Sequence, residues 1–299
     1  MAVLQDGRND IEQQTDGQPW VLKADRLTKR YGSGCSYCSV LIDPDHGNRC
    51  PVCGTVIACA DVSFTLGRGE VLGIVGESGS GKSTLMQIMN LSLPVDEGEL
   101  LFQEMDSQGH ASAGPVNLLT LDKYARRVFR NERLGIVYQR PELGLNMNFT
   151  VGGNVAEKLL LANWRNVGRI RERTSELMRL TELSPERIDD DPKKFSGGML
   201  QRVQIAKALS SSPVVLLLDE VTTGLDLSVQ ARVLDLIKQL RWELHMTMLL
   251  VSHDLGVIKQ LAERTIVMKN GRVVESGLTD QILEDPQHPY TQLLVSSAL

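Results

Sequence analysis

The chain has 299 residues, of which 42% are apolar and 23% are charged, proportions ordinary for a soluble globular protein. Its net charge of -5 argues against a main task of binding a nucleic-acid backbone, because that binding depends on neutralising phosphates. No apolar run approaches the ~20 residues of a membrane-spanning helix, and the polar first residues lack the apolar core of a secretory signal. We therefore expect a cytoplasmic protein with no direct membrane insertion and no nucleic-acid partner, whose residues 1–19 form a flexible tail.

Short apolar runs alternate with helical patterns from residue 20 onward, which predicts an α/β fold built on a largely parallel sheet. Buried strands are expected at 71–75, 134–137, 214–218 and 248–251. Between about residues 140 and 195 the pattern is mainly helical and predicts a helical subdomain. Near the end, the Asn270-Gly271 pair predicts a tight hairpin, and Thr279 can then cap a last short helix.

Four cysteines form two CxxC pairs within residues 33–58, here called the cysteine knuckle: Cys35, Cys38, Cys50 and Cys53. Four thiolates at this spacing suit a structural Zn²⁺, and so short a segment cannot bury a core of its own. A single iron atom in four sulfurs, two metal-free thiol pairs, or His46 in place of one cysteine are the alternatives. Cys59 is expected in the protein core.

The segment after the first buried strand fits the phosphate-binding P-loop pattern in full. Its residues are Gly76, Glu77, Ser78, Gly79, Ser80, Gly81, Lys82 and Ser83, with Thr84 next in the chain. The strand before it and the helical pattern after it supply the context that the pattern requires. In such a loop the backbone amides cradle phosphates, Lys82 neutralises the outer two, and the Ser83 hydroxyl ligates Mg²⁺.

A second glycine-rich turn, Ser196-Gly197-Gly198, opens a helical pattern shortly before the strand at 214–218. Two glycines let the backbone approach an anion closely, and the amides at a helix start face a phosphate. A plain helix N-cap is the alternative for this turn taken alone.

Polar residues that follow three of the predicted strands are further candidates. Asp219 and Glu220 close an apolar strand, where an unpaired charge is costly unless a cation or hydrogen bonds compensate it. His253 and Gln139 follow two other strands. A lone histidine or glutamine is more often structural, but carboxyl ends of parallel strands are where α/β proteins bind ligands.

In this order, the motifs resemble those of ATP-binding-cassette (ABC) ATPases over residues 20–275, with Ser196-Gly197-Gly198 as the family's signature. The resemblance implies a P-loop NTPase fold with a RecA-like core, an antiparallel β subdomain and a helical signature subdomain within residues 20–299. It implies ATP hydrolysis, with ATP and Mg²⁺ as cofactors. Since the family's signature completes the P-loop site of a second protomer, it also implies a homodimer or a pair with a related ABC ATPase.

The resemblance further implies roles for single residues. Asp219, Ser83 and Gln139 would hold Mg²⁺, and Glu220 would polarise the attacking water.

The remaining candidates match family positions in the same way. His253 would contact the terminal phosphate, and Tyr31 would stack on adenine. Asp226 lies in the family's D-loop, which bridges two protomers. Val221 stands where the family usually has proline, which alters the turn but removes no catalytic group.

Two branches of the family share further stretches with this chain. Residues 288–294 resemble the peptide and nickel importer ATPases, and residues 273–280 and 289–297 resemble more closely the ATP-binding subunit of the bacterial carbon-phosphorus lyase system. The second resemblance implies docking on a soluble lyase core that itself breaks the carbon-phosphorus bond during phosphonate degradation. An importer ATPase is the alternative, and a DNA-repair ABC ATPase is a third. The cysteine knuckle departs from the carbon-phosphorus lyase pattern.

Overall fold

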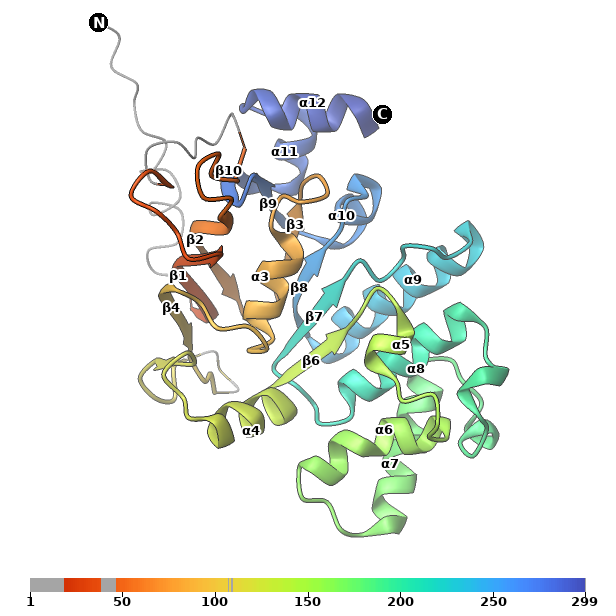
Figure 1. Cartoon of the computed structure of the whole chain (residues 1–299). Helices are drawn as coiled ribbons and strands as arrows, with labels where there is room; N and C mark the ends of the chain where they lie inside the picture. Colours follow the sequence, from red (N-terminus) through yellow and green to blue (C-terminus); the bar gives the residue numbers. More distant parts are fainter. Residues whose placement is uncertain (1–18, 39–46, 107, 109, 299) are drawn as a thin grey trace, which may run out of the picture.

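The computed structural model describes residues 19–38, 47–106, 108 and 110–298, which form two sheets with helices around them (Figure 1). The larger sheet has the order β10-β9-β3-β8-β7-β6, with β3 (Val71–Val75), β6 (Leu134–Val137), β7 (Val215–Asp219), β8 (Thr247–Val251), β9 (Arg264–Lys269) and β10 (Arg272–Leu278). The smaller sheet has the order β2-β1-β4-β5, with β1 (Trp20–Tyr31), β2 (Val56–Gly67), β4 (Glu97–Phe102) and β5 (Val116–Asn117). Residues 1–18 of the predicted tail and residues 39–46 of the cysteine knuckle, including His46, lie outside the described residues.

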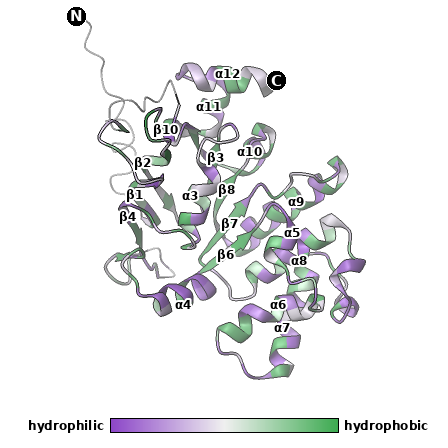
Figure 2. Ribbon diagram, in the orientation of Figure 1, coloured by the Kyte–Doolittle hydropathy of each residue, from purple (hydrophilic) through white to green (hydrophobic). Residues whose placement is uncertain are grey.

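The larger sheet is parallel except for β10 at its edge, as predicted, whereas every pairing of the smaller sheet is antiparallel. In the strands of the larger sheet, successive residues alternate between two apolar clusters. In β3, Leu72 and Ile74 belong to one cluster, and Val71 and Val75 belong to the other. A strand covered on both faces must be apolar at every position, which explains its unbroken apolar runs. Figure 2 shows these strands in green.

Helices cover both faces of the larger sheet. The described helices are α3 (Lys82–Met89), α4 (Lys123–Arg133), α5 (Pro141–Gly144), α6 (Val151–Leu161), α7 (Val167–Leu180), α8 (Gly197–Leu209), α9 (Leu227–Leu244), α10 (Leu255–Leu261), α11 (Thr279–Glu284) and α12 (Pro289–Ala298). In Figure 1, α5 to α8 gather beyond β6 and β7, away from the smaller sheet, and α11 and α12 lie near β9 and β10. None of the described helices has both the length and the apolar character that crossing a membrane demands.

The predicted strands agree closely with the observed ones. Those at 71–75 and 134–137 are β3 and β6 residue for residue, and the one at 214–218 begins one residue later as β7. Cys59 is fully buried in β2, as expected for a core residue. Continuous apolar runs between turn residues were therefore sufficient to locate the buried strands.

The two predictions near the C-terminus had different outcomes. The hairpin is confirmed, because Asn270 (φ 49°) and Gly271 (φ 82°) join the antiparallel strands β9 and β10. The cap prediction is wrong: Leu278 is the N-cap of α11, and Thr279 is its first residue. The Thr279 hydroxyl instead pairs with the buried Thr265 hydroxyl at 2.8 Å. The hydroxyl of Thr279 thus bonds to a residue of another element and does not cap the helix.

Candidate functional site

A cleft of about 600 Å³ lies where β3, β6, β7 and β8 end and the smaller sheet approaches them; we call it the P-loop cleft. The predicted site residues that line it are Tyr31, Ser78, Gly79, Gly81, Lys82, Ser83, Thr84, Gln139, Glu220 and His253. Asn48, Val56, Ala58 and Thr223 also line it. Parallel strands bring their carboxyl ends to the same edge of a sheet, which is why residues far apart in sequence meet here.

The P-loop itself passes very close to two other strands. Gly76 (φ 150°) and Gly81 (φ 108°) have backbone conformations that other residues rarely adopt. A Cβ atom at Gly76 would lie 2.1 Å from the Met268 carbonyl oxygen, and one at Gly81 would lie 2.1 Å from that of Ala58. Only glycine allows this loop to wrap so closely against β9 and β2.

Lys82 is buried, and its ammonium group donates hydrogen bonds to the loop's own carbonyl oxygens. Its Nζ lies 2.6 Å from the Gly76 oxygen and 2.9 Å from the Glu77 oxygen. Burial lowers the pKa of Lys82, and the charges of Glu220 and Asp219 oppose that shift. The loop is thus closed around a cation.

The two consecutive carboxylates at the end of β7 have different environments. Asp219 is half-buried and does not line the cleft, and burial followed by repulsion from Glu220 raises its pKa to about 6, against the attraction of Lys82. Glu220 faces the cleft, with Oε2 3.2 Å from His253 Nδ1 and 3.4 Å from Thr223 Oγ1. Asp219 is therefore half-buried beside a second negative charge, and Glu220 contacts a histidine from the loop that follows β8.

Tyr31 and Gln139 stand at the margins of the cleft. The Tyr31 side chain is 45% exposed, and its hydroxyl lies 3.5 Å from Thr84 Oγ1 at the start of α3. Lys29 Nζ lies 5.9 Å from the centroid of the Tyr31 ring. Gln139 follows β6 and is exposed. An open aromatic face therefore stands near the P-loop helix.

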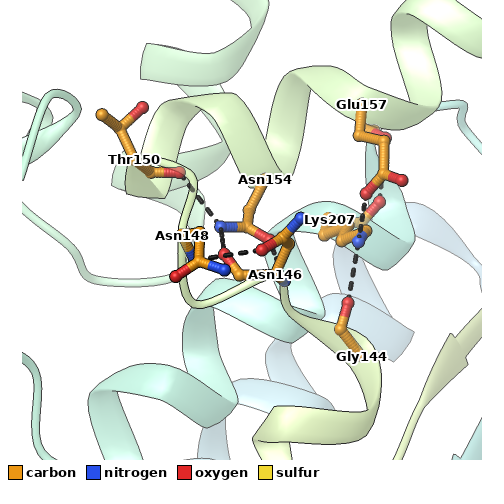
Figure 3. A network of polar contacts seen from close by, with 8 residues as sticks. Gly144, Asn146, Asn148, Thr150, Asn154, Glu157 and Lys207 are labelled. Atoms are coloured by element: carbon orange, nitrogen blue, oxygen red, sulfur yellow. Dashed lines mark hydrogen bonds and ion pairs between the residues drawn. The ribbon is translucent and has the colours of Figure 1, made fainter. Parts of the chain in front are cut away.

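The segment after Gln139 is held by a polar network that Figure 3 shows. Asn154 is fully buried on α6, and its amide nitrogen donates to the Asn146 and Thr150 carbonyl oxygens while its amide oxygen accepts from the Asn146 backbone. Lys207 of α8 donates to the Gly144 oxygen at 2.7 Å and pairs with Glu157 at 2.6 Å.

Two large apolar side chains remain exposed next to this network, Leu143 (59%) and Phe149 (48%), whereas Leu145 is buried. A firmly anchored backbone therefore presents apolar side chains to the surroundings beside the cleft.

The four cysteine sulfurs of the knuckle all lie within 4.8 Å of one another. The Cys35–Cys38 and Cys35–Cys50 separations are 3.7 Å, and the Cys38–Cys53 separation is 3.4 Å. Sulfurs at the corners of a tetrahedron with ~2.3 Å metal bonds lie ~3.8 Å apart, so this set fits Zn²⁺.

The protonation of these thiols is uneven. Hydrogen bonding with the side chain and backbone of Thr55 lowers the pKa of Cys53 to about 6. The Cys35 backbone acts to lower the pKa of Cys38, but burial and the neighbouring thiols outweigh it and raise the pKa to about 12. A metal would displace the remaining protons, because the thiolate is the ligand.

Comparisons with known proteins identify the family. A family model described as ABC transporter matches residues 59–223, which include the P-loop, both carboxylates and the second glycine-rich turn. The chain is 48% identical over 240 residues to the Putative phosphonates utilization ATP-binding protein PhnK of Escherichia coli K12, with 80% of this chain and 91% of that protein covered. It is 38% identical over 251 residues to the Oligopeptide transport ATP-binding protein OppD of Bacillus subtilis 168, with 82% and 67% covered.

The chain belongs to the ABC ATPase family. Its fold is that of solved ATP-binding cassettes. A dimeric post-hydrolysis state of the cassette MJ0796 bound to ADP and Pi matches with a TM-score of 0.69 and 27% identity over 86% of this chain and 98% of that one. The cbiO1 structure from Clostridium perfringens matches with a TM-score of 0.70 and 25% identity over 90% and 92%. This ABC ATPase is therefore an ATP-hydrolysing subunit, as the resemblance implied.

The ABC signature residues lie outside the P-loop cleft of their own chain. Ser196 is the N-cap of α8 and accepts a hydrogen bond from the Met199 amide at 3.4 Å, and both Ser196 and Gly197 are exposed. Gly198 is buried against Val229 of α9. None of the three signature residues lines the cleft.

Asp226 is likewise separate from the cleft, as the exposed N-cap residue of α9. The structure thus brings the P-loop, Glu220, His253, Tyr31 and Gln139 together within one chain of this ABC ATPase. It leaves the signature and the D-loop apart from them.

Two residues of the site escaped sequence reasoning. The buried Tyr290 of α12 accepts a hydrogen bond from the Glu77 amide of the P-loop at 3.0 Å, across 213 positions. Its only signal was membership of a C-terminal stretch shared with relatives. Asn48 lines the cleft from within the cysteine knuckle. The recognisable pattern of this segment is its cysteine spacing, and Asn48 is not part of that pattern.

Proposed function

We propose that this ABC ATPase is the ATP-binding subunit of a carbon-phosphorus lyase system and docks on a soluble lyase core in phosphonate degradation. The observation that supports the proposal is 48% identity over 91% of the E. coli phosphonates utilization protein. Peptide-transport relatives are 38% to 39% identical. An importer ATPase, with the same nucleotide chemistry and a membrane partner, is the second candidate because of those relatives.

The P-loop cleft is the proposed ATP site. Its backbone amides would cradle the phosphates, and Lys82 would exchange the loop carbonyls that it now contacts for phosphate oxygens. Tyr31 would stack on adenine through its exposed ring.

The oxygen donors beside Lys82 fit Mg²⁺, which prefers carboxylate, hydroxyl and amide oxygens. Ser83, Gln139 and Asp219 would hold it, and the raised pKa of Asp219 reflects the negative charge that a cation would balance. When bound, Mg²⁺ would neutralise charge that develops on the phosphates. Glu220 would take a proton from the attacking water, and His253, 3.2 Å away, would orient that carboxylate and meet the terminal phosphate.

The ATP site is proposed to be completed by a second protomer, a copy of this chain or a related ABC ATPase. Ser196, Gly197 and Gly198 start α8 outside their own cleft, where helix-start amides are free to meet a phosphate of a partner's ATP. Asp226 would contact the partner across the same interface. The solved relative with ADP and Pi is itself dimeric.

Zn²⁺ is the proposed occupant of the cysteine knuckle, held by Cys35, Cys38, Cys50 and Cys53. The sulfur separations of 3.4 to 3.7 Å support a single tetrahedral ion. Elemental analysis of the purified protein would show whether the four sulfurs bind zinc or iron.

The proposed docking surface is the anchored segment after Gln139 with its exposed Leu143 and Phe149. Affinity purification of the tagged chain from native cells grown on a phosphonate tests the proposal. Recovery of a soluble multi-subunit lyase core is expected, and Leu143→Asp should reduce that recovery. Leu293→Asp on α12, at a residue 62% exposed, is the matched control. Recovery of integral membrane proteins instead would favour the importer function.

A further inference from the structure

We propose that the cysteine knuckle is a wall of the ATP site, where Asn48 hydrogen-bonds to the nucleoside part of the nucleotide and bound metal thereby sets nucleotide affinity. The inference rests on the proposed ATP and metal sites and adds a binding residue to the first. It concerns the described parts of the knuckle, residues 33–38 and 47–58.

The knuckle reaches the cleft at the end where Tyr31 stands. Asn48 and Val56 line the cleft together with Tyr31 and Ala58. The Tyr31 hydroxyl is 3.5 Å from Thr84 Oγ1, so this part of the cleft borders the first turn of α3. A nucleotide whose phosphates occupy the P-loop would extend its ribose and base toward this wall. The carboxamide of Asn48 offers both a donor and an acceptor there.

A backbone hydrogen bond joins Asn48 to β2, whose first residues belong to the knuckle. The Ile57 amide donates to the Asn48 oxygen, and the Cys50 amide donates to the Thr55 oxygen, both at 2.8 Å. The other edge of β2 pairs with β1, where Val56 lies opposite Tyr31. Asn48 is thus two residues from a metal ligand and one strand away from the aromatic ring at the cleft.

Thr55 provides a second connection between the sulfurs and the cleft. It is 1% exposed, and its hydroxyl accepts a hydrogen bond from the Gly34 amide at 3.0 Å and lies 3.2 Å from Cys53 Sγ. A Cβ atom at Gly32, the residue after Tyr31, would lie 2.6 Å from this hydroxyl. A shift of Cys53 would therefore disturb the turn that follows Tyr31.

The described part of the knuckle has only a small apolar core. Its apolar cluster consists of Cys38 and Cys50, with Cys35 and Ile57 packed against them. A segment with so small a core depends on its metal for a defined structure. Metal loss should consequently release Asn48 from the cleft. Because the coupling between two binding sites is reciprocal at equilibrium, bound nucleotide should also lower the Kd for the metal by the same factor.

The test compares zinc-loaded full-length protein with the same protein stripped by a zinc-selective chelator and then refilled. Binding of ADP is measured by calorimetry at fixed Mg²⁺, so that no hydrolysis intervenes. We expect the Kd for ADP to rise about ten-fold on stripping and to recover on refilling, the size of one or two lost contacts. Tripolyphosphate has no nucleoside, so its Kd should not change.

Asn48→Ala tests the wall without removing a metal ligand. It also keeps the hydrogen bond with the Ile57 amide, because that bond uses the backbone oxygen of Asn48. It should retain zinc and bind ADP about three- to ten-fold more weakly, with unchanged tripolyphosphate binding. Val52→Ala is the control, because Val52 lies in the same knuckle, is 60% exposed and does not line the cleft. The third readout is the Kd for zinc, measured in competition with a chromogenic chelator, which ADP should lower.

Two outcomes would overturn the inference while leaving the proposed ATP site intact. The first is that Asn48→Ala binds ADP as tightly as the wild-type protein does. The second is that the metal-stripped protein keeps its native circular dichroism and its ADP affinity. Loss of ADP and tripolyphosphate binding in the zinc-loaded wild-type protein would instead contradict the proposed ATP site. The two failures are therefore distinguishable.

Discussion

Glu220 has a left-handed backbone conformation (φ 47°), which costs a residue other than glycine on the order of 1 kcal/mol. Its amide donates to the Val251 oxygen at 2.9 Å, and its carboxylate meets His253 and Thr223. These contacts offset the cost and direct the carboxylate into the cleft. Asp219, one residue earlier, does not line the cleft, so the two adjacent acids have different surroundings.

We predict that Glu220→Gln binds ATP normally and loses turnover by about 10²- to 10⁴-fold, because the amide keeps the shape of the carboxylate but cannot take a proton. Steady-state phosphate release and equilibrium ATP binding measure the two effects. Glu172→Gln on the exposed face of α7 is the control. Near-normal phosphate release from Glu220→Gln would refute the assignment.

Asp219 gives a prediction about pH. Its pKa of about 6 in the folded chain lies above the ordinary value of 3.8, so the folded state binds this proton more tightly than the unfolded chain does. Ionisation of Asp219 therefore lowers the free energy of unfolding as pH rises from about 4 to about 6, and the cost is complete above pH 6.

Asp219→Asn should accordingly stabilise the nucleotide-free protein by about 1 to 3 kcal/mol at pH 7.5 and by nothing measurable near pH 4. Urea unfolding at both pH values measures this. A gain that is equal at the two pH values would show that the charge of Asp219 is not its cause.

At the scale of elements, the P-loop is shaped by strands and a helix that lie elsewhere in the chain. β9 and β2 approach Gly76 and Gly81 so closely that no side chain fits. α12 adds the Tyr290 hydroxyl, which satisfies the Glu77 amide. The C-terminal helix thereby supports the P-loop, which we propose to bind ATP.

Tyr290→Phe should weaken ATP binding about five- to ten-fold, because a P-loop amide loses its partner and the loop loses a contact that fixes its shape. Fluorescence titration with a labelled nucleotide measures the affinity. Tyr124→Phe on α4, where the side chain is 65% exposed, should have no effect. Equal affinities for the two variants would mean that α12 does not support the loop.

At the scale of the whole molecule, one chain holds the two proposed halves of an ATP site, and these halves do not meet within the chain. The cleft lies at the ends of β3, β6, β7 and β8. Ser196 is the N-cap of α8, in the group of helices beyond β6 and β7 (Figure 1). A head-to-tail pair of chains would join each cleft to the partner's signature.

A mixing experiment tests this pairing. Lys82→Ala and Ser196→Arg should each be inactive alone, the first because it binds nucleotide weakly and the second because a bulky side chain blocks the signature. In a mixed homodimer, one site combines the intact P-loop of Ser196→Arg with the intact signature of Lys82→Ala. Equal mixing should thus restore up to about a quarter of wild-type ATPase activity, measured by phosphate release. No recovery at any mixing ratio would exclude a homodimer with composite sites.

The sequence by itself determined the buried strands, the hairpin at Asn270-Gly271, the family and the motif residues that line the cleft. These signals are local: an apolar run marks a strand buried on both faces, and a P-loop needs only its neighbouring strand and helix. The wrong cap prediction at Thr279 shows the limit of such signals, because Thr279 begins α11 and the partner of its hydroxyl, Thr265, lies in β9.

Only the tertiary structure decided which residues touch across long separations. It brought Tyr290 to Glu77 and Asn48 to the side of Tyr31, and it separated Ser196 from the cleft of its own chain. Such contacts depend on how whole elements pack, and no local pattern of residues encodes them. The tetrahedral closeness of the four sulfurs is of the same kind, since CxxC spacing sets each pair but packing sets the distance between the pairs.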